Sequence, residues 1–394
     1  MIYADNAATT QLSEAALRAM LPFFRERYGN PSSLHSPGQT AAEALFRARE
    51  AIARCLNCSP REIFFTSCGT ESDNQALRTA AAWGAAHGKR HIISTAFEHH
   101  AVLRTLEALE QEGFQVELLD VSCGHNITAA QVEAAIRPDT CLVSAMFANN
   151  EIGSVLPVAG IGAVCRRNGV LFHTDAVQAA GQLPIDVQAQ CIDLLSLSAH
   201  KFHGPKGIGA LYCRRDLSPA GLILGGAQER GRRAGTENVP AIVGMAAALT
   251  ESCDHMEENR LHVTALRDQL IDGLSRIPHC VLNGDPLHRL PGNVSFCFEG
   301  VEGEALLLLL DQRGIAAGSG SACASGSLEP SHVLLAVGRP RAISHSSLRL
   351  SLSHTNTQDD VDEMLHAVPE IVTKLRRTSP IWRAMEDGSR PHLI

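Results

Sequence analysis

The chain has 394 residues, of which 45% are hydrophobic and 19% are charged, and 34 basic against 42 acidic residues give a formal net charge of −8. This composition is typical of a globular protein, and the mildly acidic balance argues against nucleic acid or an anionic membrane as the main partner. The start, MIYADNAATT, lacks the basic residues and apolar core of a signal peptide, and the apolar run VPAIVGMAAAL is too short to span a bilayer, so we expect a cytoplasmic protein without a membrane partner.

The twelve cysteines are spread along the chain and do not form the dense pattern of a disulfide framework. Cys55 and Cys58 have the spacing of a zinc or redox site, but a tetrahedral zinc site needs two more ligands and no second pair has that spacing. We therefore interpret most cysteines as small core residues and expect no metal site.

Short apolar runs alternate with helical patterns over the first 250 residues. The candidate strands are residues 62–67, 91–97, 140–148, 169–174, 192–198 and 207–213. The segments between the first five have apolar residues at three- and four-residue spacing and several end in glycine, which is typical of helices. This alternation predicts an α/β fold whose central sheet is mostly parallel, with helices on both faces.

The pattern changes after about residue 254. A long helical stretch, short strands at residues 279–284 and 292–300, a leucine-rich helix, a segment of small residues and a strand at residues 347–353 follow in that order. We predict a large α/β domain at residues 12–254. Residues 1–11 and 255–394 are expected to form a smaller α+β domain, which carries Cys323 on a mobile loop at about residues 318–330.

Polar residues follow each of the first five candidate strands. They are CGTESDN at residues 68–74, EHH at 98–100, NNE at 149–151, DAVQ at 175–178 and AHK at 199–201. In open α/β sheets ligands bind beyond the carboxyl ends of the strands, so these five clusters should converge on one site.

The chemistry of these clusters favours one kind of cofactor. Lys201, at the end of a buried strand, is a candidate for a desolvated amine that forms a Schiff base, although a solvated surface lysine is the alternative. Asp175 needs a cationic partner, which a protonated pyridine nitrogen supplies. Gly69 and Thr70 begin a helix, where free N–H groups suit a phosphate, although plain capping is the alternative. Together these parts match a pyridoxal phosphate site.

A set of motifs in this order resembles one enzyme family. The motifs are YADNAATT, GNPSSLH, TSCGTESDN, ANNEIG, HTDAVQAAG, AHKFHGPKGIGALY, ERGRRAGTEN, SGSACASGSLEPSHVL and SLRLSLS. They resemble the cysteine desulfurases of the NifS/IscS group, within the class V aminotransferases of fold type I, and RRAGTEN and TSCGTESD are more similar to the NifS branch. Gly318 departs from the serine that the group usually has there.

The resemblance implies roles around the cofactor ring. Lys201 would carry pyridoxal phosphate, Asp175 would pair with its ring nitrogen, Gln178 would bond its ring hydroxyl, and His99 would stack on the ring and help to move protons. His100 and His203, the near neighbours of two site histidines, are interpreted as structural.

The resemblance also implies how phosphate and substrate are held. The phosphate would contact Gly69, Thr70, Ser198 and His200, joined by Thr236 from the other subunit of a homodimer. Asn150, beside the cofactor, and Arg349 would bind the carboxylate of the substrate, L-cysteine.

The implied reaction converts L-cysteine to L-alanine and leaves the sulfur on Cys323 as a persulfide. The sulfur then passes to an acceptor or iron–sulfur scaffold protein. Gly318 and Gly320 are expected to give the cysteine loop its freedom of movement. A selenocysteine lyase or a small-substrate aminotransferase is the alternative within the same cofactor class, and a non-catalytic iron–sulfur scaffold is the alternative outside it.

Overall fold

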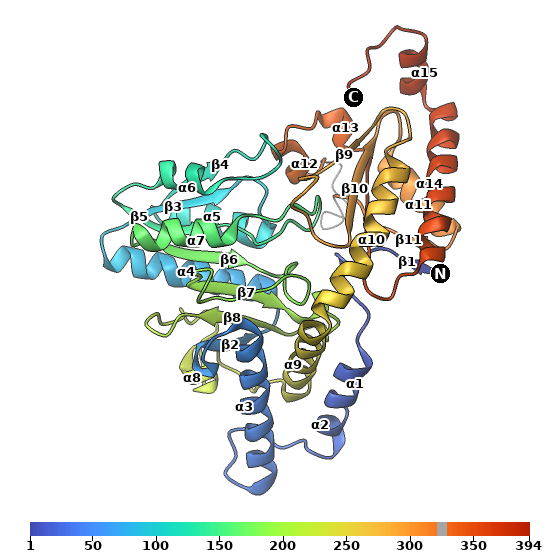
Figure 1. Ribbon diagram of the computed structural model, residues 1–394. Coiled ribbons are helices and arrows are strands. Elements are labelled where there is room, and N and C mark those ends of the chain that lie inside the picture. Colours follow the sequence, from blue (N-terminus) through green and yellow to red (C-terminus); the bar gives the residue numbers. More distant parts are fainter. Residues whose placement is uncertain (321–328) are drawn as a thin grey trace.

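The computed structural model describes residues 1–320 and 329–394. Cys323 and its neighbours in residues 321–328 lie outside the described residues. Figure 1 shows a large sheet with helices on both sides and, beside it, a smaller sheet covered by long helices near the C-terminus. No helix in the described part of the chain is both long and apolar enough to cross a membrane.

The large sheet has seven strands. They are β2 (Ile63–Thr66), β3 (His91–Thr95), β4 (Gln115–Leu119), β5 (Thr140–Ser144), β6 (Leu171–Asp175), β7 (Leu194–Ser198) and β8 (Gly209–Cys213). Their order in the sheet is β2-β8-β7-β6-β5-β3-β4, and β8 runs antiparallel to both of its neighbours while the pairs from β7 to β4 are parallel. The predicted mostly parallel sheet is confirmed.

Strand β4 was not predicted from the sequence. It lies at the edge of the sheet, and Gln115, Glu117 and Leu118 in it are exposed. An edge strand with this exposure lacks the continuous apolar run by which buried parallel strands are identified.

Helices cover both faces of the large sheet because neighbouring residues of each strand point to opposite sides. Phe64 and Ile92 belong to one core with α4 (Gly69–Ala86) and α5 (His100–Gln111). Phe65 and Ile93, the next residues along, belong to the other core. That second core includes residues from α3 (Ser36–Leu56), α6 (Ala129–Ala135), α7 (Val158–Arg167) and α9 (Val239–Asp254).

The smaller sheet is antiparallel and has its own core. It consists of β9 (Cys280–Leu282), β10 (Asn293–Phe298) and β12 (Ser347–Ser351), with β10 in the middle. Phe296 and Leu350 pack in one cluster with residues of α10 (Met256–Leu274), α11 (Gly303–Gln312) and α14 (Gln358–Thr378). The boundary near residue 254, between α9 and α10, stays a prediction.

Short elements complete the described chain. They are β1 (Ile2–Tyr3) and β11 (Ile315–Ala316), which pair in parallel, with α1 (Glu14–Met20), α2 (Pro22–Arg25), α8 (Gln228–Gly231), α12 (His332–Ala336), α13 (Arg341–Ser344), α15 (Pro380–Glu386) and the 3₁₀ turns η1 (Pro60–Glu62) and η2 (Ala199–Lys201). The β1–β11 pair brings the N-terminal motif beside the smaller sheet.

The two cysteines with zinc-like spacing are not paired with each other. The thiol of Cys55 contacts Cys253 of α9, and this hydrogen bond lowers the pKa of Cys55. Burial raises the pKa of Cys58 to about 12, so its thiol stays protonated near neutral pH. These contacts agree with a packing role for both residues.

Candidate active site

One cavity of about 300 Å³ lies at the carboxyl ends of the parallel strands. It is lined by ten of the residues predicted from the sequence, which are Gly69, Thr70, His99, Asn150, Asp175, Gln178, Ser198, His200, Lys201 and Arg349. Thr236, also predicted, is exposed in the loop before α9 and is not among the residues that line this cavity. Cys323 lies outside the described residues.

Lys201 is held by the N-terminal segment of the chain. It is the last residue of η2, directly after β7, and its Nζ donates hydrogen bonds to the carbonyl oxygens of Ala7 (2.6 Å) and Ala8 (2.8 Å). The Gln178 amide also donates to the Ala7 carbonyl, at 2.9 Å. The amine is therefore held beside Gln178 by the N-terminal segment and points into the cavity.

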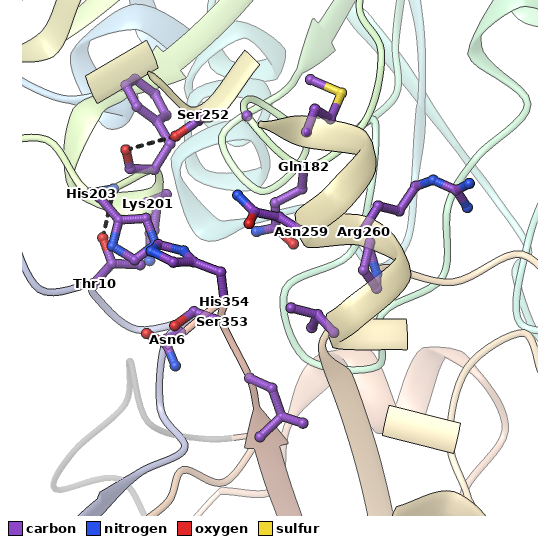
Figure 2. A pocket seen from close by; sticks show the side chains of 16 residues that line it. Asn6, Thr10, Gln182, Lys201, His203, Ser252, Asn259, Arg260, Ser353 and His354 are labelled. Carbon is purple, nitrogen blue, oxygen red and sulfur yellow. Dashed lines mark hydrogen bonds between the residues drawn. The ribbon is translucent and has the colours of Figure 1, made fainter. Parts of the chain in front are cut away.

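A second, smaller cavity also reaches Lys201. It lies between the large sheet and the start of α10, and Figure 2 shows Thr10, His203 and His354 beside Lys201 with Asn259 of α10 across from them. The His203 ring contacts the His354 ring. The Nδ1 of His203 forms a hydrogen bond with the carbonyl oxygen of Gln11 at 3.0 Å. Lys201 thus lines both cavities, and its side chain has space on either side.

Asp175 ends β6, is buried, and lines the larger of the two cavities that Lys201 reaches. One carboxylate oxygen accepts a hydrogen bond from the Val177 amide at 2.9 Å. Burial raises the pKa of Asp175 to about 6, while the Val177 amide and the positive charge of Lys201 oppose that shift. A buried carboxylate with this environment favours a cationic ligand.

His99 lies at the start of α5 and stays neutral. Its Nδ1 accepts a hydrogen bond from the Ala101 amide at 3.1 Å, so the neutral ring carries its proton on Nε2. Burial, together with the charges of Lys201 and His100, lowers the pKa of His99 to about 4. The ring can stack on a planar ligand and offer a proton from Nε2.

The N-terminus of α4 also lines the cavity. The helix has 18 residues, and its N-cap residue, Cys68, makes no side-chain capping bond, so the first N–H groups are open to a ligand. A Cβ on Gly69 would lie 2.7 Å from Cγ2 of Val177 and 3.4 Å from Cβ of Ser198. Only glycine fits without displacing the neighbouring wall, and the open helix end suits an anion.

Arg349 of β12 closes the side of the cavity that faces the smaller sheet. Its Nη2 donates a hydrogen bond to the Asp5 carboxylate at 2.8 Å, and its Nη1 donates one to the Asn150 carbonyl at 3.2 Å. Its buried Nε has no hydrogen-bond partner in the described part of the chain. A guanidinium with an open donor in a cavity is suited to a carboxylate ligand.

The structure corrects the prediction that Gly318 moves freely. Its backbone exchanges two hydrogen bonds with Arg349, at 3.0 and 2.7 Å, so this residue is firmly held and does not have the freedom expected of it. A Cβ at this position would lie 2.7 Å from both Arg349 Nη2 and Asp5 Oδ1. Close packing therefore explains the glycine here.

The sequence reasoning missed several residues that line the cavity. They are Ala7, Ala8, Cys68, Asp73, Met146, Ala148 and Val177. Ala7 and Ala8 act through backbone carbonyls, which carry no side-chain signal. Asp73 lies within the quoted TSCGTESDN motif, but its position on the inward face of α4 becomes clear only from the packing of that helix.

Comparison with known proteins gives a consistent result. Residues 2–364 match the family model described as aminotransferase class-V. The chain is 52% identical to a cysteine desulfurase IscS of Methanosarcina thermophila, covering 96% of this chain and 94% of that protein, and 49% identical to a cysteine desulfurase IscS of Clostridium botulinum, covering 97% and 96%.

Solved structures agree. A NifS-like protein, 39% identical, superposes with a TM-score of 0.88 and covers 95% of this chain and 99% of its own. SspA in complex with cysteine, 36% identical, superposes with a TM-score of 0.79 and covers 91% and 100%.

Proposed function

The chain belongs to the aminotransferase class-V family, and from this premise we propose that it is a pyridoxal phosphate-dependent cysteine desulfurase, which converts L-cysteine to L-alanine and retains the sulfur as a protein persulfide. The observation that carries this proposal is that Lys201, Asp175 and Arg349 line one cavity. These three residues supply an amine, a buried carboxylate and a carboxylate-binding guanidinium.

The residues of the cavity fit the cofactor. The open N-terminus of α4 with Gly69 would hold the phosphate, Asp175 would face the protonated ring nitrogen, and His99 would lie against the ring. When bound, pyridoxal phosphate supplies an electron sink for the pair left at the substrate's Cα.

The residues of the chain would bind the substrate and transfer its protons. Arg349 would hold the substrate carboxylate and so orient the Cα–H bond, and the Lys201 amine would take the proton from Cα. Once the substrate's thiol has given its proton to solvent, His99 would donate a hydrogen bond from Nε2 to the charged sulfur. A cysteine thiolate of the enzyme would then take the sulfur, so that the C–S bond of the substrate breaks, an S–S bond forms, and alanine is released after Cβ gains a proton.

Cys323 is proposed as that acceptor thiol, and a homodimer in which Thr236 completes the phosphate site is proposed as the working state. The sulfur would pass from Cys323 to an acceptor protein of iron–sulfur or other sulfur-cofactor assembly. The names of the relatives support the desulfurase activity itself.

The proposal is tested by incubating the purified protein with pyridoxal phosphate and L-cysteine. We expect alanine and protein persulfide in equal amounts in the first turnover, and alanine with sulfide when a reducing thiol is added. Activity with selenocysteine alone would favour the selenocysteine lyase, and amino-group transfer to a keto acid would favour the aminotransferase.

Asp175→Asn is expected to retain bound cofactor but to lose at least about 99% of its alanine formation, since the amide cannot keep the ring nitrogen protonated. The measurement pairs cofactor absorbance with alanine release. Near-normal desulfuration by a fully loaded variant would contradict the role given to Asp175.

Arg349→Ala is expected to raise KM for L-cysteine by at least about tenfold while the absorbance of the bound cofactor stays unchanged, because a charge-assisted contact to the substrate carboxylate is lost. Arg349→Lys keeps the positive charge but not the paired donors, so its KM should lie between those of the parent and of Arg349→Ala. A KM equal to the parent's in Arg349→Ala would show that the carboxylate binds elsewhere.

A further inference from the structure

A second acidic residue, Asp73, lines the proposed active cavity together with Asp175. It is on the first turns of α4, its side chain is 2% exposed, and it lines the same cavity as Asp175 and Lys201. Its Oδ1 has no hydrogen-bond partner among the residues that the structure describes. A buried carboxylate oxygen without a partner costs free energy, so this group needs an explanation.

The imidazole of His173, which lies beside Asp73, does not supply a positive charge. The His173 Nε2 lies 3.6 Å from Asp73 Oδ1, but burial lowers the pKa of His173 to about 3, so the ring is neutral. Both ring nitrogens also have hydroxyl partners, Ser144 at 2.9 Å and Ser196 at 3.1 Å. His173 therefore belongs to a neutral hydrogen-bonded chain beneath the cavity.

The other titratable groups around Asp73 are mostly acidic. Burial and the negative charge of Asp175 raise the pKa of Asp73 well above its usual value, with smaller effects of Glu98 and Cys68 in the same direction and an opposing effect of the Ser196 hydroxyl. Burial also raises the pKa of Glu98 to about 8. The positive charge of Lys201 acts on Asp175 and opposes the rise of its pKa.

We propose that Asp73 is a positioning residue for Asp175: it remains a neutral carboxylic acid, so that the negative charge of this buried cluster lies on Asp175, where it faces the ring nitrogen. Because two neighbouring buried carboxylates repel each other and the positive charge of Lys201 favours ionisation of Asp175, the proton on Asp73 fixes which carboxyl is ionised. This inference rests on the proposed function, since it concerns the carboxylate that faces the cofactor.

Two substitutions separate this role from that of a charged or a merely space-filling residue. Asp73→Asn has the shape and neutrality of the protonated acid and should retain the cofactor with a dissociation constant within about threefold of the parent's. Asp73→Ala is also neutral, but it leaves His173 and Ser196 without the acid that lies beside them, so Asp175 should be less well positioned and cofactor retention should weaken by at least about tenfold. The control is Thr174→Val, which removes a buried hydroxyl without a hydrogen-bond partner among the described residues, next to Asp175. This variant should leave the dissociation constant of the cofactor unchanged.

A second measurement tests the protonation state directly. The infrared difference spectrum between the cofactor-loaded parent and Asp73→Asn at pH 8 should contain the band of a protonated carboxylic acid. A carboxylate band instead, or equal loss of cofactor in Asp73→Asn and Asp73→Ala, would overturn the proposal, as would normal retention in both variants. If the proposed function itself is wrong, the parent will neither bind pyridoxal phosphate nor form alanine, which is a different result.

Discussion

Lys201→Ala is expected to abolish alanine formation and the covalent attachment of pyridoxal phosphate. Lys201 ends η2 directly after a buried strand, and its amine lies in the cavity that also contains Asp175 and the start of α4. Since the same amine is proposed to carry the cofactor and to take the proton from Cα, its loss should lower the rate by at least about 100-fold.

The measurement combines cofactor absorbance with mass spectrometry after borohydride reduction, which should find the pyridoxyl group on the peptide that contains Lys201. Lys206→Ala is a matched control, because Lys206 lies five positions later on the same loop and is exposed. A reducible adduct on another lysine in the Lys201→Ala variant would show that the assignment is wrong.

Sequence reasoning predicts the central sheet of this protein well because buried parallel strands are continuous apolar runs. The strands around Phe64, Ile92 and Leu142 all have that pattern, and polar residues follow each of them. The common direction of these strands then brings Gly69, His99 and Asn150 to one edge, so their convergence could be predicted without coordinates.

The remaining parts of the site depend on contacts between distant segments. The carbonyl oxygens of Ala7 and Ala8, near the N-terminus, accept hydrogen bonds from Lys201 in the middle of the chain. No periodic pattern in the sequence identifies a backbone carbonyl as such a hydrogen-bond partner. The fixed position of Gly318 likewise follows from its pairing with Arg349, whereas a glycine-rich sequence by itself indicates freedom. Strand β4 was not predicted because an exposed edge strand lacks a continuous run of apolar residues.

The functional family was accessible from the sequence because its motifs are long and occur in a fixed order. The protonation of individual carboxyls was not, because Asp73 and Asp175 have the same unperturbed pKa and differ only in their burial and partners. The difference between the two carboxyls, on which the proposal for Asp73 depends, therefore comes from their local environment and not from residue type.

Cys323→Ala is expected to separate substrate binding from sulfur transfer. Lys201, Asp175 and Arg349 remain in this variant, so addition of L-cysteine should still change the absorbance of the bound cofactor. Alanine formation should fall by at least about 100-fold, because no thiolate takes the sulfur and the C–S bond of the substrate therefore stays intact. Cys323 lies outside the described residues, so this prediction rests on the sequence motif and on the proposed function.

Two other thiols provide controls. Cys68 lines the cavity at the start of α4, and Cys123 is exposed, so each tests whether a nearby or a merely accessible thiol can accept the sulfur. Cys68→Ala and Cys123→Ala should both form alanine at close to the parent rate, and single-turnover mass spectrometry should find one added sulfur on the peptide that contains Cys323. Because each persulfide formed leaves one alanine, the two products must appear in equal amounts. Alanine release by Cys323→Ala at the parent rate, with the added sulfur on Cys68, would assign the transfer to the helix N-terminus instead.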